Sequence, residues 1–135
     1  LPEGLIVYTE YSDGERVERN SDAECLDLPM AVLMNDASAS ASEILAGALQ
    51  DYGVAKIVGI QSYGKGIVQS ILDLQDGTAL KLTTAKYYTP NGNNIHGVGI
   101  TPDVEIDLPE ELKTAVTISF EEDVQLQKAI EVLQQ

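Results

Sequence analysis

Hydrophobic and polar residues alternate along much of the first third of the chain, and this pattern predicts β-strands. Residues 5–11 are rich in β-branched and aromatic side chains, and after an Asp-Gly turn residues 15–19 resume a polar alternation. This pattern predicts a hairpin with one exposed face. Residues 20–27 are acidic and lack a period, which indicates a loop, and the apolar run 30–34 is typical of a buried strand.

The next segment predicts a strand, helix and strand in succession. After the apolar run, apolar residues from Ile44 to Tyr52 recur at helical spacing, and Gly53 is a stop signal for the helix. Residues 54–60 form a further apolar strand candidate. Because a helix connects the two strands, we expect them to pair in parallel through a right-handed crossover.

The second half predicts a hairpin, an irregular stretch and a terminal helix. Residues 66–74 and 78–85 flank an Asp-Gly dipeptide, which is a strong hairpin signal. Residues 89–103 are rich in Pro, Gly and Asn and end in a short apolar alternation at 104–108, whereas residues 121–135 carry an amphipathic stripe. The order of these elements predicts an α/β fold with a mixed β-sheet and flanking helices.

The length, the net charge and the counts of Cys and His limit the kinds of molecule that this chain can bind. The chain has 135 residues, the size of a single domain, and 22 acidic residues against eight basic ones give a net charge of −14. Nucleic acids and anionic membrane surfaces are therefore disfavoured as partners. Cys25 and His96 are the only residues of their kinds, so we expect neither a disulfide within the chain nor a structural metal site.

A run of serines separates the predicted strand from the helix. Residues 35–43 read Asn-Asp-Ala-Ser-Ala-Ser-Ala-Ser-Glu. A hydroxyl at a strand-to-helix turn can face backbone N–H donors, as serine nucleophiles do. Ser40 and Glu43 also fit a capping box, in which the hydroxyl only satisfies the helix N-terminus. No Gly-x-Ser-x-Gly elbow is present.

A serine nucleophile needs a base, and the sequence offers two kinds. His96 lies in a loop rich in Gly and Asn, where a solvated side chain is the commoner outcome. Lys65 stands between two glycines and beside apolar residues, and a lysine can activate a hydroxyl. The alternative for Lys65 is an ordinary surface turn, and the phosphate-binding pattern Gly-x-x-x-x-Gly-Lys-Ser/Thr is absent.

Three motifs in this order resemble the carboxyl-terminal processing proteases, the tail-specific serine proteases of peptidase family S41. The motifs are Ser-Ala-Ser-Ala-Ser-Glu-Ile at 38–44, Tyr-Gly-Lys-Gly-Ile-Val-Gln at 63–69 and Leu-Lys-Leu-Thr-Thr-Ala-Lys-Tyr-Tyr-Thr-Pro-Asn-Gly at 80–92. The resemblance runs from residue 1 to residue 135 and implies a ClpP/crotonase-like fold. His96 stands where we expect a glutamine.

The resemblance assigns roles to individual residues. It makes Ser40 the nucleophile, Lys65 the general base and Gln69 the residue that orients the lysine, with the backbone N–H of Ala41 in the oxyanion hole. A lysine acts as a base only when uncharged, so we expect Lys65 to be buried among apolar neighbours with no carboxylate on its amine. Gln69 lies four residues further along a strand and needs a bend to reach Lys65.

The resemblance also implies what the whole protein does. Residues 1–135 correspond to the C-terminal portion of the protease domain, without its N-terminal portion and without a PDZ domain. We therefore expect a serine endopeptidase that cleaves protein substrates near their C-terminal tails, outside the cytoplasm and without a cofactor. The isolated chain should be inactive and should self-associate through an exposed sheet edge. The alternative is a non-catalytic protein-binding or scaffolding module.

Overall fold

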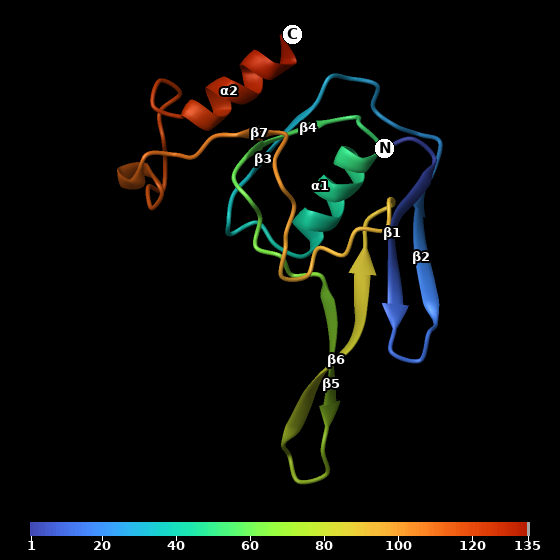
Figure 1. Ribbon diagram of the computed structural model, residues 1–135. Coiled ribbons are helices and arrows are strands. Elements are labelled where there is room, and N and C mark those ends of the chain that lie inside the picture. The colour runs from blue at the N-terminus through green and yellow to red at the C-terminus, as the bar shows by residue number, and fades with distance from the viewer. Residues whose placement is uncertain (135) are drawn as a thin grey trace.

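The computed structural model describes residues 1–134, which form two sheets and two α-helices (Figure 1). In chain order the elements are β1 (Gly4–Tyr11), β2 (Arg16–Ser21), β3 (Ala31–Met34), α1 (Ala41–Asp51), β4 (Lys56–Gly59), β5 (Ile67–Asp73), β6 (Ala79–Tyr88), β7 (Val104–Glu105), the 3-10 turn η1 (Glu110–Leu112) and α2 (Val124–Leu133).

The strands divide between an antiparallel sheet and a parallel sheet. The antiparallel sheet has the order β2-β1-β6-β5 and contains both predicted hairpins. The parallel sheet has the order β3-β4-β7, and β3 and β4 pair in parallel across α1, as the strand-helix-strand pattern predicted. The α/β fold is confirmed, and its parallel and antiparallel pairings lie in separate sheets.

Helix α1 lies between the two sheets and carries the first residue of the candidate site at its N-terminus. Small residues, chiefly alanine and Gly47, fill its buried face and let it pack closely against β1 and β4. Gly53 has a φ of 66°, a conformation that glycine adopts without strain, and it ends the helix as predicted. The core around α1 consists of Val7, Met34, Ala46, Ile57, Tyr87, Ile95 and Ile100.

Helix α2 packs against β3 and β4 on the far side of the parallel sheet from the hairpins (Figure 1). The Asp123 side chain accepts a hydrogen bond from the Leu126 N–H at 2.9 Å, so the helix begins three residues later than the amphipathic stripe predicted. The end of that prediction, residue 135, lies outside the described residues. No helix within residues 1–134 is long and apolar enough to cross a membrane.

One prediction about burial is wrong in part. The apolar run that became β3 was expected to be fully buried, yet only Met34 is, at 4% exposure, whereas Leu33 is 43% exposed. The strand lies at the edge of the three-stranded sheet, which leaves one of its sides without a neighbouring strand. Apolar composition alone therefore does not separate an edge strand from a central one.

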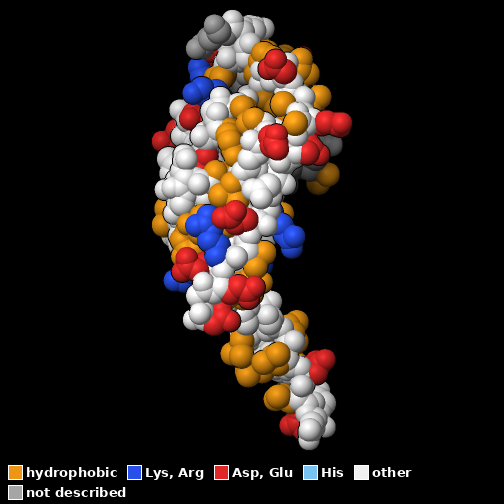
Figure 2. Space-filling view, turned by 90° about the vertical axis from the view of Figure 1, so that its right-hand side faces the viewer, with side chains coloured by type: hydrophobic (Ala, Val, Ile, Leu, Met, Phe, Trp, Pro, Cys, Tyr) orange, Lys and Arg blue, Asp and Glu red, His pale blue; other side chains and the backbone are white. Residues whose placement is uncertain are grey.

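The β5–β6 hairpin projects away from the rest of the molecule, and its end carries exposed leucines (Figures 1 and 2). Register places Leu72 opposite Leu80 and Leu82 opposite Ser70, so the even-numbered residues share one face. We call Leu72, Leu74, Leu80 and Leu82 the leucine face; each is between 41% and 49% exposed.

Candidate active site

Ser40 occupies a strained turn at the start of α1. Its φ of 58° and ψ of −114° make it the single residue other than glycine with a positive φ within residues 1–134. The Ser40 N–H donates to Glu43 Oε2 at 2.8 Å, and the Ser40 carbonyl accepts from the Ile44 N–H at 3.0 Å. The capping box is thus present, but capping alone does not require a positive φ. Such strain is typical of a nucleophile on a strand-to-helix turn.

The Glu43 carboxylate is fully buried and joins the start of α1 to the segment 60–66. Oε2 accepts from the Lys65 N–H at 2.9 Å as well as from Ser40. Oε1 accepts from Ser62 Oγ at 2.5 Å and from the Gly64 N–H at 2.6 Å. Since one oxygen atom binds the amides of Ser40 and Lys65, their two nitrogens lie within about 6 Å of each other.

These hydrogen bonds also decide the charge of Glu43. Burial raises the pKa of its carboxyl, and the bonds from Ser62, Lys65, Gly64 and Ser40 lower it. The hydrogen bonds outweigh burial, so the pKa of Glu43 lies below its ordinary value of 4.5 and the group is ionised at neutral pH. A buried charge whose oxygens are fully hydrogen-bonded makes a rigid support for the two segments.

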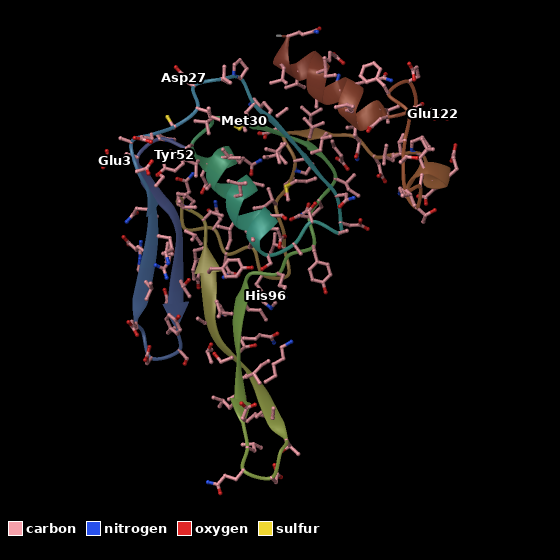
Figure 3. All side chains as sticks on the ribbon, turned by 180° about the vertical axis from the view of Figure 1, so that it is seen from behind. Glu3, Asp27, Met30, Tyr52, His96 and Glu122 are labelled. Carbon is pink, nitrogen blue, oxygen red and sulfur yellow. The ribbon has the colours of Figure 1, made fainter. Side chains whose placement is uncertain are left out.

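Glycines beside Lys65 let residues 95–100 pack directly on the segment that carries it. A Cβ added at Gly66 would lie 2.5 Å from the His96 nitrogen, and one added at Gly64 would lie about 3 Å from three further backbone nitrogens. The Gly97 N–H donates to the Gly64 carbonyl at 2.9 Å. Figure 3 shows His96 near the base of the β5–β6 hairpin, close to the N-terminal end of α1. The Gly-Lys-Gly sequence is therefore needed for backbone packing.

The side chain of Lys65 is exposed, so the prediction that it is buried is wrong for this structure. The flanking glycines contribute no covering side chain, and the neighbouring Tyr63 is itself 67% exposed. Within residues 1–134 no carboxylate forms an ion pair with the Lys65 amine. The backbone of Lys65 is held beside Ser40, whereas its side chain is exposed.

Gln69 is not brought to Lys65. Its side-chain amide donates to Thr83 Oγ1 at 3.5 Å across the β5–β6 hairpin, and a bulge between Val68 and Gln69 alters the register there. We expected a bend at Gly64 and Gly66 to bring Gln69 to Lys65. These glycines come before β5, and Gln69 lies within the extended strand that leads away from the turn. Its role as the residue that orients Lys65 stays a prediction.

The other predicted residues lie as follows. Ala41 is the first residue of α1 and is exposed, and within residues 1–134 no acceptor takes its N–H, as expected at a helix N-terminus. The side chain of His96 is exposed in its loop, and its N–H donates to Asn94 Oδ1 at 2.9 Å. Among the described residues no cluster of three His, Cys, Asp or Glu could hold a metal ion.

Sequence reasoning missed two residues that support the site. Glu43 was assigned only to the capping box. Ala46 and Gly47 follow it by three and four residues, so all three lie on the same buried face of the helix. A glutamate on such a face signals a buried charge that has hydrogen-bond partners. Tyr87 was not singled out; its phenol donates a hydrogen bond to the Lys65 carbonyl from inside the core. Strand alternation could have placed Tyr87 inward, but not against Lys65.

Comparisons with known proteins show the family of the chain. The sequence profile described as Peptidase family S41 matches residues 1–106. A carboxyl-terminal-processing protease of Synechocystis sp. is 44% identical over 98% of this chain and 31% of its own length. A carboxy-terminal-processing protease of Bartonella bacilliformis is 52% identical over 84% of this chain and 27% of its own length. The chain therefore spans about a third of the curated relatives it matches.

Solved structures give the same result for the fold. The photosystem II D1 C-terminal processing protease superposes with a TM-score of 0.71 at 40% identity, covering 83% of this chain and 30% of that one. A lipoprotein from Streptococcus agalactiae superposes with a TM-score of 0.73 over 99% of this chain and 46% of its own. Its identity is 18%, so this second likeness concerns the fold alone.

Proposed function

This chain belongs to peptidase family S41, and we propose that the protein containing it is a serine endopeptidase that cleaves protein substrates near their C-terminal tails. Ser40 and Lys65 carry the reaction. The observation that supports this most directly is the single Glu43 oxygen that binds the amides of both residues, which holds the backbones of nucleophile and base together. The printed names of the Synechocystis and Bartonella relatives support the reaction class.

The proposed reaction has two steps. Ser40 Oγ attacks the scissile carbonyl carbon while its proton passes to the uncharged Nζ of Lys65, and Lys65 then gives that proton to the leaving amine as the C–N bond breaks. Lys65 then takes a proton from water as the water attacks the acyl ester, and it returns that proton to Ser40 Oγ as the ester C–O bond breaks. The free Ala41 N–H at the helix N-terminus is suited to stabilise the oxyanion.

The exposed amine of Lys65 explains why this chain alone should be inactive. A base of this kind must be shielded from water, and in residues 1–134 nothing covers it. The resemblance puts residues 1–135 in the C-terminal portion of the catalytic domain, and the chain spans 31% of the Synechocystis relative. The remaining portion would cover Lys65 and supply a second oxyanion donor, and Gln69 would turn toward the lysine in that assembly.

Substrate recognition follows from the sheet edge. Strand β5 has β6 on one side and, within residues 1–134, no partner on the other, and it begins two residues after Lys65. An extended substrate can add to such an edge through main-chain hydrogen bonds, which suits substrates of varied sequence. We place the protein outside the cytoplasm, as the resemblance implies. The reaction requires no cofactor.

The test uses the full-length protein that contains this segment. Peptides and a folded protein with an unstructured tail serve as substrates, and a fluorophosphonate probe reports directly on an activated serine. We expect cleavage and labelling with the wild-type protein and neither with Ser40→Ala. Ser42→Ala is the matched control, because Ser42 is an exposed serine two residues further on and should leave both unchanged.

A binding or scaffolding module is the second candidate, and the exposed amine of Lys65 is the observation that favours it. Within residues 1–134 this amine lacks the shielding from water that a lysine base requires. Such a module would bind tail peptides with equal affinity in the wild-type protein and in Ser40→Ala, without cleavage or probe labelling. That pair of results would replace the protease proposal.

A further inference from the structure

Tyr87 is a buried phenol that touches both members of the proposed dyad. It lies near the end of β6, is 5% exposed and belongs to the core cluster around α1. Its neighbour Tyr88 lies on the other face of the strand, half-buried, with its ring stacked on Tyr8 at a centroid distance of 4.9 Å. Two adjacent tyrosines thus sit in different surroundings.

Hydrogen bonds tie Tyr87 to the segment that carries Lys65. The Tyr87 phenol donates to the Lys65 carbonyl, and the Tyr87 N–H donates to the Gly66 carbonyl at 3.1 Å. The Ser40 hydroxyl lies close enough to the same phenol to lower its pKa. One side chain therefore binds the backbone of Lys65 and lies near the hydroxyl of Ser40.

The direction of these bonds follows from counting protons. A phenol has one proton and a carbonyl can only accept, so the proton of Tyr87 goes to Lys65. Any hydrogen bond between the two hydroxyls therefore has the phenol oxygen as acceptor and the Ser40 hydroxyl as donor. Burial, chiefly, and the negative charge of Glu43 raise the pKa of Tyr87 above its ordinary value of 10 despite the contact with Ser40, so the phenol keeps its proton at neutral pH.

We propose that Tyr87 is a positioning residue of the active site: it fixes the main chain of Lys65 by donating to its carbonyl, and it holds the Ser40 hydroxyl in its resting orientation by accepting a hydrogen bond from it. This inference rests on the proposed protease function and adds a residue to that site. Glu43 holds the two residues from the amide side, and Tyr87 holds them from the side of the lysine carbonyl. The Lys65 side chain can then swing only about a fixed Cα.

The consequence concerns turnover more than substrate binding. Without the phenol, the Lys65 carbonyl loses its donor and the Ser40 hydroxyl loses its acceptor, so both reacting groups sample positions in which no proton can pass. Substrate contacts along the edge of β5 do not involve Tyr87, whose ring lies in the core. A defect at Tyr87 should therefore lower kcat and leave KM nearly unchanged.

The experiment measures kcat, KM and fluorophosphonate labelling of Tyr87→Phe in the full-length protein, with Tyr88→Phe as the matched control. We expect kcat and the labelling rate to fall about ten- to hundredfold for Tyr87→Phe, with KM changed less than about threefold. Tyr88→Phe should stay within about twofold of wild type in all three quantities. Placing 4-aminophenylalanine at position 87, which keeps a donor for the Lys65 carbonyl, should restore part of kcat.

Each outcome bears on a different claim. If Ser40→Ala and Lys65→Ala are inactive while Tyr87→Phe matches wild type, the inference about Tyr87 is overturned and the protease proposal stands. If Ser40→Ala remains active, the protease proposal itself fails. Equal kcat for the variants with phenylalanine and with 4-aminophenylalanine at position 87 would also overturn the inference. A residue that only fills space in the core would give the same kcat with or without a hydrogen-bond donor. Should Tyr87→Phe not fold, 4-fluorophenylalanine, which is closer in size to tyrosine and lacks a donor, replaces it in the same comparison.

Discussion

The two ends of strand β5 are built in opposite ways. At its start, residues 62–66 are held by Glu43, by the glycine-rich loop 95–100 and by Tyr87, and every one of these supports lies within the described chain. At its far end the leucine face of the hairpin has no cover within residues 1–134 (Figure 2). The backbone of the site is thus complete, whereas the surface beyond it is not.

The comparison of the two ends of β5 distinguishes the contacts that residues 1–134 make by themselves from the contacts that need further protein. Fixing the backbones of Ser40 and Lys65 requires only local contacts. Shielding the Lys65 amine and covering the leucine face require further protein, whether from the rest of the polypeptide, from a substrate or from a second copy. Changes at the start of β5 should therefore affect catalysis and folding, and changes at its far end should affect association.

The largest effect should come from the dyad. In the full-length protein, Ser40→Ala and Lys65→Ala should each lower kcat by about 10⁴-fold or more, because they remove the nucleophile and the base. Lys65→Arg should be equally inactive, since a guanidinium does not give up its proton. Peptide cleavage assays measure this, and unchanged circular dichroism should show that folding is intact.

The control for the lysine is Lys56→Ala, which removes an exposed lysine from β4 and should leave turnover unchanged. Turnover by Lys65→Ala within tenfold of wild type would show that the fixed backbone at the start of β5 serves another purpose.

The next largest effect should come from Glu43→Gln. The amide keeps the shape of the side chain but turns one acceptor into a donor that faces backbone N–H groups. We expect a loss of about 3 kcal/mol in the free energy of unfolding and a fall in kcat, because Ser40 and Lys65 lose their common anchor. Urea denaturation of the 135-residue chain measures the first effect.

Glu105→Gln is the matched control for this change, since Glu105 is an exposed glutamate on β7 and should leave the unfolding curve in place. A Glu43→Gln chain as stable as wild type would mean that the four hydrogen bonds contribute nothing net.

Acid should weaken the same anchor. The folded-state pKa of Glu43 is lowered, so its contribution to stability is fully present above the unfolded value near 4.5 and is lost as the pH falls through the folded value. Stability of the wild-type chain should therefore decline below pH 4.5, and the decline should be shallower in Glu43→Gln. Thermal melts across this range measure it. Parallel curves for the two chains would contradict the assignment.

The smallest effect on stability, with a clear effect on association, should come from the leucine face. Leu72→Thr with Leu80→Thr removes a cross-strand pair that is nearly half exposed, so unfolding should change by less than about 1 kcal/mol. We expect the wild-type chain to self-associate in sedimentation experiments and the double variant to do so much less. Ile71→Thr, on the opposite face, is the control. A monomeric wild-type chain would refute the expected association.

Much of the fold could be predicted because its signals are local. Asp-Gly turns between alternating strands gave both hairpins, and the helical spacing before Gly53 gave α1. The division of strands between two sheets could not be predicted in this way. It depends on which strands become neighbours in space, such as β1 beside β6, and that choice is made by packing across long separations.

The candidate site shows the same limit. The serine run and the Gly-Lys-Gly motif made Ser40 and Lys65 candidates beside blander interpretations, and the resemblance to a known family assigned their roles. The exposure of Lys65, the turn of Gln69 toward Thr83 and the contact of Tyr87 with the Lys65 carbonyl depend on tertiary placement of side chains. No period or spacing in the sequence carries that information.

The buried carboxylate of Glu43 also couples the local unfolding of two segments that are distant in the sequence, the start of α1 and residues 62–65. Neither the start of α1 nor residues 62–65 can separate from the other without exposing the hydrogen bonds of a charge that is otherwise out of water. The amide protons of Gly64 and Lys65, although they lie in a loop, should therefore exchange with deuterium as slowly as those of the central strands. We therefore expect the slowest-exchanging loop of this chain to be the one that carries Lys65 of the proposed active site.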